Sequence, residues 1–283
     1  MPTATIKLFL LHGEAKRLRA AEILNWTGKA VAGPRSELEG VLAREEAAKS
    51  GVYFLIGTDS ESGKSAVYIG EAESIRDRLR GHLDKDFWNH VIFFVSKDEN
   101  LTKGHVRYLE GRLIEQAKSA ARSLVTNGQS SGSKLPESDR ADMEIFLEKI
   151  HQLMPVLGAD FLLPIASAPE GHAKRQILFC EIKGLTATGY LTPTGFVVLK
   201  GSQAVLKERA SAHQYPYSIA SRRRLIEDGT LMEEKEHLRF TRDAEFSSPS
   251  AAAAVVHGGS ANGLLAWKGK DGKTLKELEA VNK

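Results

Sequence analysis

The segment that decides the fold spans residues 51–70 and reads GVYFLIGTDSESGKSAVYIG. Both of its ends are apolar and rich in β-branched and aromatic residues, whereas its middle is polar and contains glycine and serine. We therefore expect two strands, at 51–56 and 66–69, which the loop 57–65 joins into a hairpin. A further apolar run at 91–95 predicts a third strand.

A helix is expected over 74–83, directly after the hairpin. Ser74 and Asp77 have the spacing of a capping box at its start. Arg78 and His82 lie together on one flank of its apolar stripe, which is formed by Ile75, Leu79 and Leu83. For this segment alone, a solvated basic helix is the simpler interpretation. The flank is nevertheless a place from which an arginine reaches a cleft.

A second helix is expected over 102–121, and it carries an acidic residue at an apolar position. Its buried stripe is formed by Val106, Leu109, Leu113, Ala117 and Ala120. Glu110 falls inside the wider apolar arc, whereas Glu115 falls on the opposite, solvated face. A carboxylate among core positions is destabilising unless it is paired or bound to metal. A salt bridge and a metal ion remain equally open as the partner of Glu110.

Tyr53 and Tyr68 lie in the two apolar strands expected in the hairpin, one in each. Taken alone, each is typical of a core tyrosine with its hydroxyl hydrogen-bonded. Their contexts, Gly-Val-Tyr at 51–53 and Tyr-Ile-Gly at 68–70, occur in this order on adjacent expected strands. Together they resemble the GIY-YIG nuclease family, which includes excision-repair nucleases, homing endonucleases and some restriction enzymes. Val52 replaces the isoleucine of the name motif.

The resemblance extends over about 80 residues, to elements that follow the hairpin. Arg78 matches the family's arginine on the next helix, in a run that ends at His82. The family's metal-binding glutamate lies in a Leu-Glu-x-x-Leu-Ile setting, which Glu110 matches. Asn127 matches the asparagine after that helix. The resemblance thus selects the same glutamate that helical periodicity singles out.

The resemblance implies an α+β fold in which a three-stranded antiparallel sheet is flanked by helices. It also implies a hydrolase, a metal-dependent endonuclease that uses Mg²⁺ (or Mn²⁺). Glu110 would be the one protein ligand of the ion, with water and phosphate oxygens completing the shell. Arg78 would stabilise the charge that develops on the phosphate.

Other residues of the motif would support this chemistry. Tyr53 would orient or deprotonate the attacking water, and Tyr68 and His82 would support the proton network. Asn127 would position groups by hydrogen bonding. Lys64, in the hairpin loop, could touch phosphate, although a solvated loop lysine is the simpler interpretation.

Changes in sequence texture predict the domain organisation. A strand/helix extension at 1–47 is expected to precede a nuclease domain at 48–130, and a linker with a helix follows at 131–165. An α+β region is expected at 166–283, with a small domain at about 236–283. The elements expected outside the nuclease domain are a strand at 5–10 and helices at 15–25, 37–49 and 138–153.

The region 236–283 looks like an uncharacterised small domain found at the C-termini of such nucleases. It is also similar to a module associated with restriction enzymes and adenine methylases that is thought to recognise DNA. Ser250 is a candidate N-cap for an alanine-rich helix, and Trp267 is expected to anchor a small core. Upstream, 196–225 holds six basic residues against one acidic residue. Phosphate contacts are expected from three of the basic residues, Arg222, Arg223 and Arg224, although a solvated surface fits equally well.

Composition limits the remaining possibilities. The net charge of +3 is weakly basic, and the single cysteine, Cys180, excludes an internal disulfide framework and fits a cytoplasmic location. The N-terminus lacks the pattern of a secretory leader, and the apolar run 91–95 is too short to cross a membrane. DNA is the expected partner, with RNA and the oligomeric state left open. Two alternatives are a catalytically inactive nucleic-acid-binding protein and a C-terminal half that binds protein.

Overall fold

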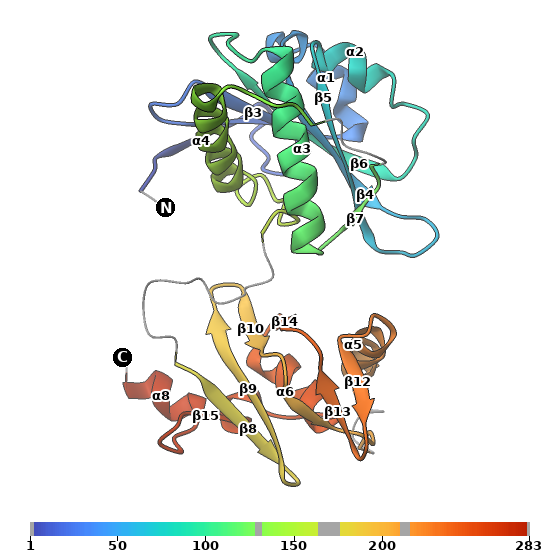
Figure 1. Cartoon of the computed structure of the whole chain (residues 1–283), viewed down its shortest axis with the longest axis vertical. Helices are drawn as coiled ribbons and strands as arrows, with labels where there is room; N and C mark the ends of the chain where they lie inside the picture. Colours follow the sequence, from blue (N-terminus) through green and yellow to red (C-terminus); the bar gives the residue numbers. More distant parts are fainter. Residues whose placement is uncertain (1–2, 128–131, 164–175, 210–215, 282–283) are drawn as a thin grey trace. The chain divides into compact units, whose positions relative to one another are not determined.

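The computed structural model describes residues 3–127, 132–163, 176–209 and 216–281 (Figure 1). The chain forms two units, Met1–Pro164 and Ile165–Lys283. The boundaries expected at residues 47 and 130 lie inside the first unit, so the expected extension and linker helix share a unit with the hairpin.

In the described part of the first unit, seven strands form one sheet in the order β1-β2-β3-β6-β4-β5-β7. Neighbouring strands are antiparallel except for the parallel pair β5 and β7. The three expected strands are present as β4, β5 and β6, but the sheet is wider than expected because β3 continues it from β6. The strands are β1 (Ile6–Leu10), β2 (Arg19–Ile23), β3 (Gly28–Pro34), β4 (Gly51–Thr58), β5 (Ser65–Ala72), β6 (Trp88–Ser96) and β7 (Leu124–Val125).

Two expectations for the N-terminal segment are wrong. The helix expected at 15–25 is instead β2, because pairing on both sides with β1 and β3 overrides the local preference of its alanines. The helix expected at 37–49 is reduced to α1 (Leu38–Leu42), with one-turn 3₁₀ segments on either side of it. The strand expected at 5–10 is confirmed as β1.

Helices cover both faces of the sheet (Figure 1). Val52 and Phe54 of β4 pack against α3 (Lys103–Ala120) and α4 (Glu137–Leu153). Tyr53 and Leu55 pack against the opposite layer, which holds α1 and α2 (Ile75–Arg80). Because β4 is buried on both faces, its sequence is a continuous apolar run rather than an alternating one.

The helix ends follow their capping residues. The Ser74 hydroxyl accepts a hydrogen bond from the Asp77 backbone N–H (3.3 Å), as its spacing predicts. However, α2 ends at Arg80, so Leu83 is 50% exposed and does not extend the apolar stripe as expected. All five residues of the stripe predicted for α3 are buried, and α4 confirms the helix expected at 138–153.

The described part of the second unit holds a five-stranded sheet, β14-β10-β9-β8-β15, and a three-stranded sheet, β11-β13-β12. No helix in the described ranges is long and apolar enough to span a membrane. The strands are β8 (Leu178–Ile182), β9 (Leu185–Thr192), β10 (Gly195–Val198), β11 (Gln203–Val205), β12 (Leu231–Glu234), β13 (His237–Phe240), β14 (Ala244–Phe246) and β15 (Trp267–Lys268). The helices are α5 (Pro216–Glu227), α6 (Pro249–His257), α7 (Gly263–Ala266) and α8 (Leu275–Val281).

Ser250 does not cap the alanine-rich helix as expected. Ser248 is the N-cap of α6, because its hydroxyl accepts from the Ala251 N–H and Pro249 occupies the first helical position. Ser250 instead accepts a hydrogen bond from the Gly263 N–H (3.0 Å). Trp267 is fully buried in the core of the unit, as predicted.

A buried carboxylate ties β3 to the segment before β4. Glu46 is 3% exposed, and one of its oxygens lies 2.5 Å from Lys29 Nζ and 2.8 Å from Arg44 Nη2. Burial opposes ionisation of Glu46, but the hydrogen bonds from Arg44 and Lys29 outweigh it and hold its pKa at about 2. The folded state therefore binds a proton at Glu46 less tightly than the unfolded chain does.

We predict that Glu46→Gln lowers the free energy of unfolding by about 3 kcal/mol at neutral pH. A depressed carboxyl pKa stabilises the fold above the unfolded value and loses that contribution as pH falls toward 2, so the substitution should also flatten this acid dependence. Urea unfolding at a series of pH values measures both effects. The control is the exposed neighbour Glu45→Gln, and equal losses in the two variants would contradict the assignment.

Candidate active site

The candidate site lies at an open edge of β5. The parallel strand β7 pairs only with Ala66 and Val67 of β5. One step further, the Asn127 side chain accepts from the Ile69 N–H (2.8 Å) and donates to the Ile69 carbonyl. The Asn127 side chain therefore makes the two backbone hydrogen bonds at Ile69 that a neighbouring strand would otherwise make. Groups from both faces of the sheet can meet at the edge of β5 beyond Ile69.

A close approach between β4 and β5 positions the two motif tyrosines. Tyr53 and Gly70 are direct partners across the strand pair. A Cβ atom on Gly70 would lie 2.3 Å from the Tyr53 hydroxyl oxygen, so only glycine leaves room for the phenol ring. The Tyr53 and Tyr68 rings then lie 6.1 Å apart, centroid to centroid.

The Tyr53 hydroxyl connects α2 to the strands. It lies 2.7 Å from His82 Nε2, and Arg78 Nε donates a hydrogen bond to it over 3.3 Å. The His82 ring in turn packs 5.0 Å from the Tyr68 ring. The structure thus brings together the four residues that the sequence predicts for this side of the site.

The protonation states of Tyr53 and His82 follow from burial. Burial, followed by the neighbouring Tyr68, raises the pKa of Tyr53 above its usual value, although Arg78 opposes the shift. Burial, followed by the charges of Lys85 and Arg78, lowers the pKa of His82 to about 4. Tyr53 is therefore a protonated phenol and His82 a neutral imidazole at neutral pH.

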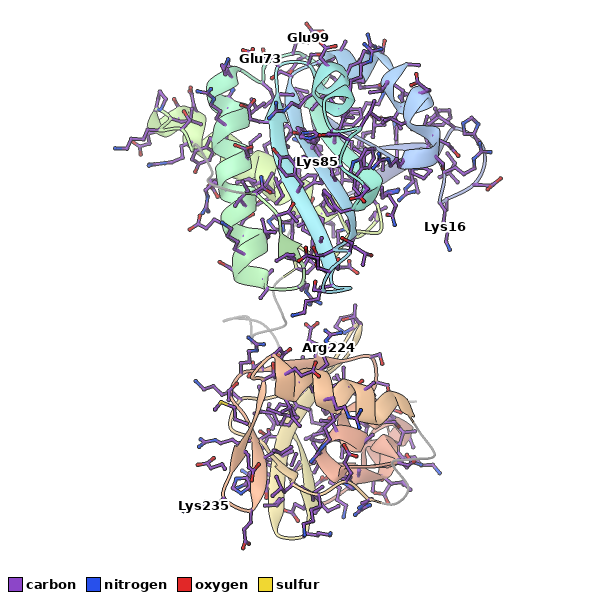
Figure 2. All side chains as sticks on the ribbon, turned by 90° about the vertical axis from the view of Figure 1, so that its right-hand side faces the viewer. Lys16, Glu73, Lys85, Glu99, Arg224 and Lys235 are labelled. Carbon is purple, nitrogen blue, oxygen red and sulfur yellow. The ribbon has the colours of Figure 1, made fainter. Side chains whose placement is uncertain are left out.

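This environment changes the role expected of Tyr53. Its side chain is fully buried, and its hydroxyl contacts Arg78 and His82. A buried phenol with a raised pKa suits the positioning of Arg78 better than the deprotonation of water. Tyr68 is only half-buried, and its ring contacts Lys85 Nζ at 4.1 Å. Lys85, labelled in Figure 2, lies in front of the strands of the first unit.

Glu110 approaches the same edge from α3, on the other side of β5. Its side chain is half-buried, and its carboxylate accepts a hydrogen bond from the Glu71 backbone N–H. Burial raises the pKa of Glu110, the Glu71 charge raises it further, and the charges of Arg78 and Arg107 oppose this shift. Arg107 pairs with Glu71 (3.6 Å), one turn before Glu110 on α3. Glu110 therefore faces a second carboxylate and lies within the field of Arg78.

The donor set fits a hydrated divalent cation. Within the described ranges, no three or more His, Cys, Asp or Glu side chains are arranged to hold a metal. Glu110 and Glu71 are two oxygen donors whose mutual repulsion a cation would relieve. Mg²⁺ is commonly held by one or two carboxylates with water completing its octahedral shell. Glu110 and Glu71 are therefore the residues that could hold Mg²⁺ or Mn²⁺, and the site is poor in ligands for zinc.

Two sets of predicted residues lie apart from these groups. Lys64 is exposed in the hairpin loop, about 20 Å along β5 from Glu71. Arg222 is wrongly placed by the sequence prediction, because it is 2% exposed and its guanidinium donates to backbone carbonyls of Val205, Leu206 and Val255. Arg223 and Arg224 are exposed on α5, and Arg224 is labelled in Figure 2.

Three residues at the candidate site are not predicted from the sequence: Glu71, Arg107 and Lys85. The first two carried usable signals, since Glu71 directly follows the Tyr-Ile-Gly motif and Arg107 precedes Glu110 by three helical positions. Lys85 lies in the irregular segment between α2 and β6, where periodicity gives no orientation.

Comparison with protein families identifies the second unit only in general terms. Residues 178–279 match the model of a family described as a domain of unknown function, DUF4357. The expected uncharacterised C-terminal domain is therefore confirmed, and the match begins well before the expected start at residue 236. Comparisons with curated proteins and with solved structures find no match.

We predict that Gly70→Ala displaces the Tyr53 ring and lowers the free energy of unfolding by about 1–3 kcal/mol, because the added methyl group overlaps the phenol. Urea unfolding measures the loss. The matched control is Gly40→Ala at an exposed position of α1, where a Cβ meets only Leu18 Cδ2 at 3.4 Å. If both variants kept full stability, the close approach of Tyr53 to Gly70 would be wrong.

Proposed function

We propose that the first unit is a metal-dependent endonuclease of the GIY-YIG type that hydrolyses phosphodiester bonds in nucleic acid, with DNA as the substrate. The observation that carries the proposal is the position of Arg78. Its guanidinium donates a hydrogen bond to the Tyr53 hydroxyl, and its positive charge opposes the rise in the pKa of Glu110 that burial causes. The resemblance of the motif residues to the family supports the same function.

Phosphodiester hydrolysis places negative charge on the phosphate oxygens and on the leaving oxygen. A divalent ion, when bound, polarises the phosphate and favours departure of the leaving oxygen. Glu110 would hold this ion, with Glu71 as its neighbour. Arg78 stabilises the developing charge, because a guanidinium offers phosphate oxygens two parallel N–H donors. Arg78 is exposed to solvent while Tyr53 holds its Nε, so its remaining N–H groups are available to a phosphate.

The tyrosines and His82 prepare Arg78 and the attacking water. Tyr53 and His82 are positioning residues, since burial removes both from direct contact with substrate. Both tyrosine hydroxyls interact with the Arg78 guanidinium and raise its pKa, Tyr53 more strongly. Tyr68 is the tyrosine open enough to orient a water molecule beside the phosphate. This division of roles assigns the two motif tyrosines different functions.

We predict metal-dependent cleavage of plasmid and oligonucleotide DNA by the full chain. Glu110→Gln and Arg78→Ala should each lower the cleavage rate by at least about a hundredfold, because each removes charge stabilisation at the scissile phosphate. Cleavage in Mg²⁺, Mn²⁺ and EDTA is followed on gels.

The matched controls are Glu115→Gln, on the exposed face of the same helix, and Arg80→Ala, two positions from Arg78. Both should cleave like the wild type. Cleavage that survives Glu110→Gln and Arg78→Ala would place the active site elsewhere. DNA binding without cleavage by the wild type would favour the inactive nucleic-acid-binding protein.

We further propose that the second unit contributes affinity for nucleic acid through Arg223 and Arg224. Replacing both by alanine should weaken DNA binding and reduce the slope of log affinity against log salt by up to about 2, since each phosphate contact contributes about 0.9. Fluorescence anisotropy in EDTA measures the slope. An unchanged slope in the double variant would favour a protein-binding role for this unit.

Arg222→Ala should instead lower the free energy of unfolding, because it leaves buried carbonyls unpaired.

A further inference from the structure

A groove of 430 Å³ lies between the end of β5 and the first turns of α3. Glu71 and Glu73 line one wall, Lys103 and Arg107 line the other, and Arg78 lies at the groove as well. Glu73, labelled in Figure 2, lies beside α3 at one end of the first unit. The groove therefore shares Arg78 and Glu71 with the proposed active site.

One face of α3 connects the groove to that site. Lys103, Arg107 and Glu110 follow one another at intervals of four and three residues, which places them in a single row along the helix. The rise between Lys103 and Arg107 is about 6 Å. The row leads from two basic side chains to the carboxylate that would hold the metal ion.

Two ion pairs span the groove. Lys103 Nζ lies 3.3 Å from Glu73 Oε1, and Arg107 Nε lies 3.6 Å from Glu71 Oε1. The two basic side chains are 52% and 44% exposed, so their ion pairs are screened by solvent and contribute little to stability. A phosphate oxygen can therefore replace either carboxylate as the partner of Lys103 or Arg107.

We propose that this groove binds the nucleic-acid strand next to the scissile phosphate, with Arg107 and Lys103 as its phosphate contacts. In the free protein, Glu71 and Glu73 pair with Arg107 and Lys103, so the two carboxylates compete with the incoming phosphates. Asp77, the third acidic residue of the groove, pairs with Arg80 (3.9 Å). The identity of the ligand as a nucleic-acid strand rests on the proposed function.

The test compares substitutions at Lys103 and Glu73, the two members of one ion pair, which should change the affinity for DNA in opposite directions. Binding of the full chain to a labelled DNA oligonucleotide is measured by anisotropy in EDTA. Lys103→Ala and Arg107→Ala should each weaken binding by about three- to tenfold, because each removes a phosphate contact. Glu73→Gln should strengthen binding by about two- to fivefold, because it releases Lys103 from its competitor.

Two controls change the same charges on α3 outside the groove. Lys118→Ala lies at the other end of the helix, and Glu115→Gln lies on its exposed face. Both should bind like the wild type, and circular dichroism confirms that every variant is folded. If the controls change the affinity as much as the groove variants do, or if Glu73→Gln weakens binding, the nucleic-acid strand does not bind in this groove.

The cleavage assay separates this inference from the proposed function. If the wild type cleaves DNA but the groove variants bind it with unchanged affinity, strand binding in the groove is wrong and the nuclease proposal stands. If the wild type does not cleave but the affinities change as predicted, the groove binds nucleic acid and the nuclease proposal is wrong.

Discussion

The packing of the Tyr53 ring over Gly70 is the constraint on which the candidate site depends. The missing side chain of Gly70 leaves room for the ring between β4 and β5, and the Tyr53 hydroxyl then contacts Arg78 and His82 of the next segment. Since β4 is buried on both faces, the phenol cannot relax away from the glycine without disturbing the centre of the sheet. One hydrogen-bonded hydroxyl thereby couples the core of the unit to Arg78, which is exposed.

The open edge of β5 explains how groups from opposite faces of a sheet converge. Tyr68 and Arg78 approach from the layer that contains α2, whereas Glu110 approaches from α3. A full-length strand next to β5 would separate them. The short β7 and the Asn127 side chain satisfy the edge at Ala66–Ile69, and at Glu71 the Glu110 carboxylate accepts the backbone N–H instead of a strand. The same arrangement leaves room for the groove that runs along α3.

The sequence predicts the elements whose signals are local. The hairpin, the buried stripe of α3 and the half-buried Glu110 follow from composition and periodicity, and all are present. The misplaced elements depend on distant partners. Strand β2 forms because β1 and β3 flank it, and Arg222 is buried because carbonyls 16 to 33 residues away accept its hydrogen bonds. The burial of Tyr53 likewise depends on α2 packing over the hairpin.

We propose that a divalent ion binds the Glu110 carboxylate at the edge of β5. Anomalous diffraction from a crystal of the full chain soaked in Mn²⁺ shows where the ion binds. We expect a difference peak at the Glu110 carboxylate in the wild type and its loss in Glu110→Gln. A wild-type crystal whose only manganese peak lies away from Glu110, together with metal-dependent cleavage in solution, would contradict it.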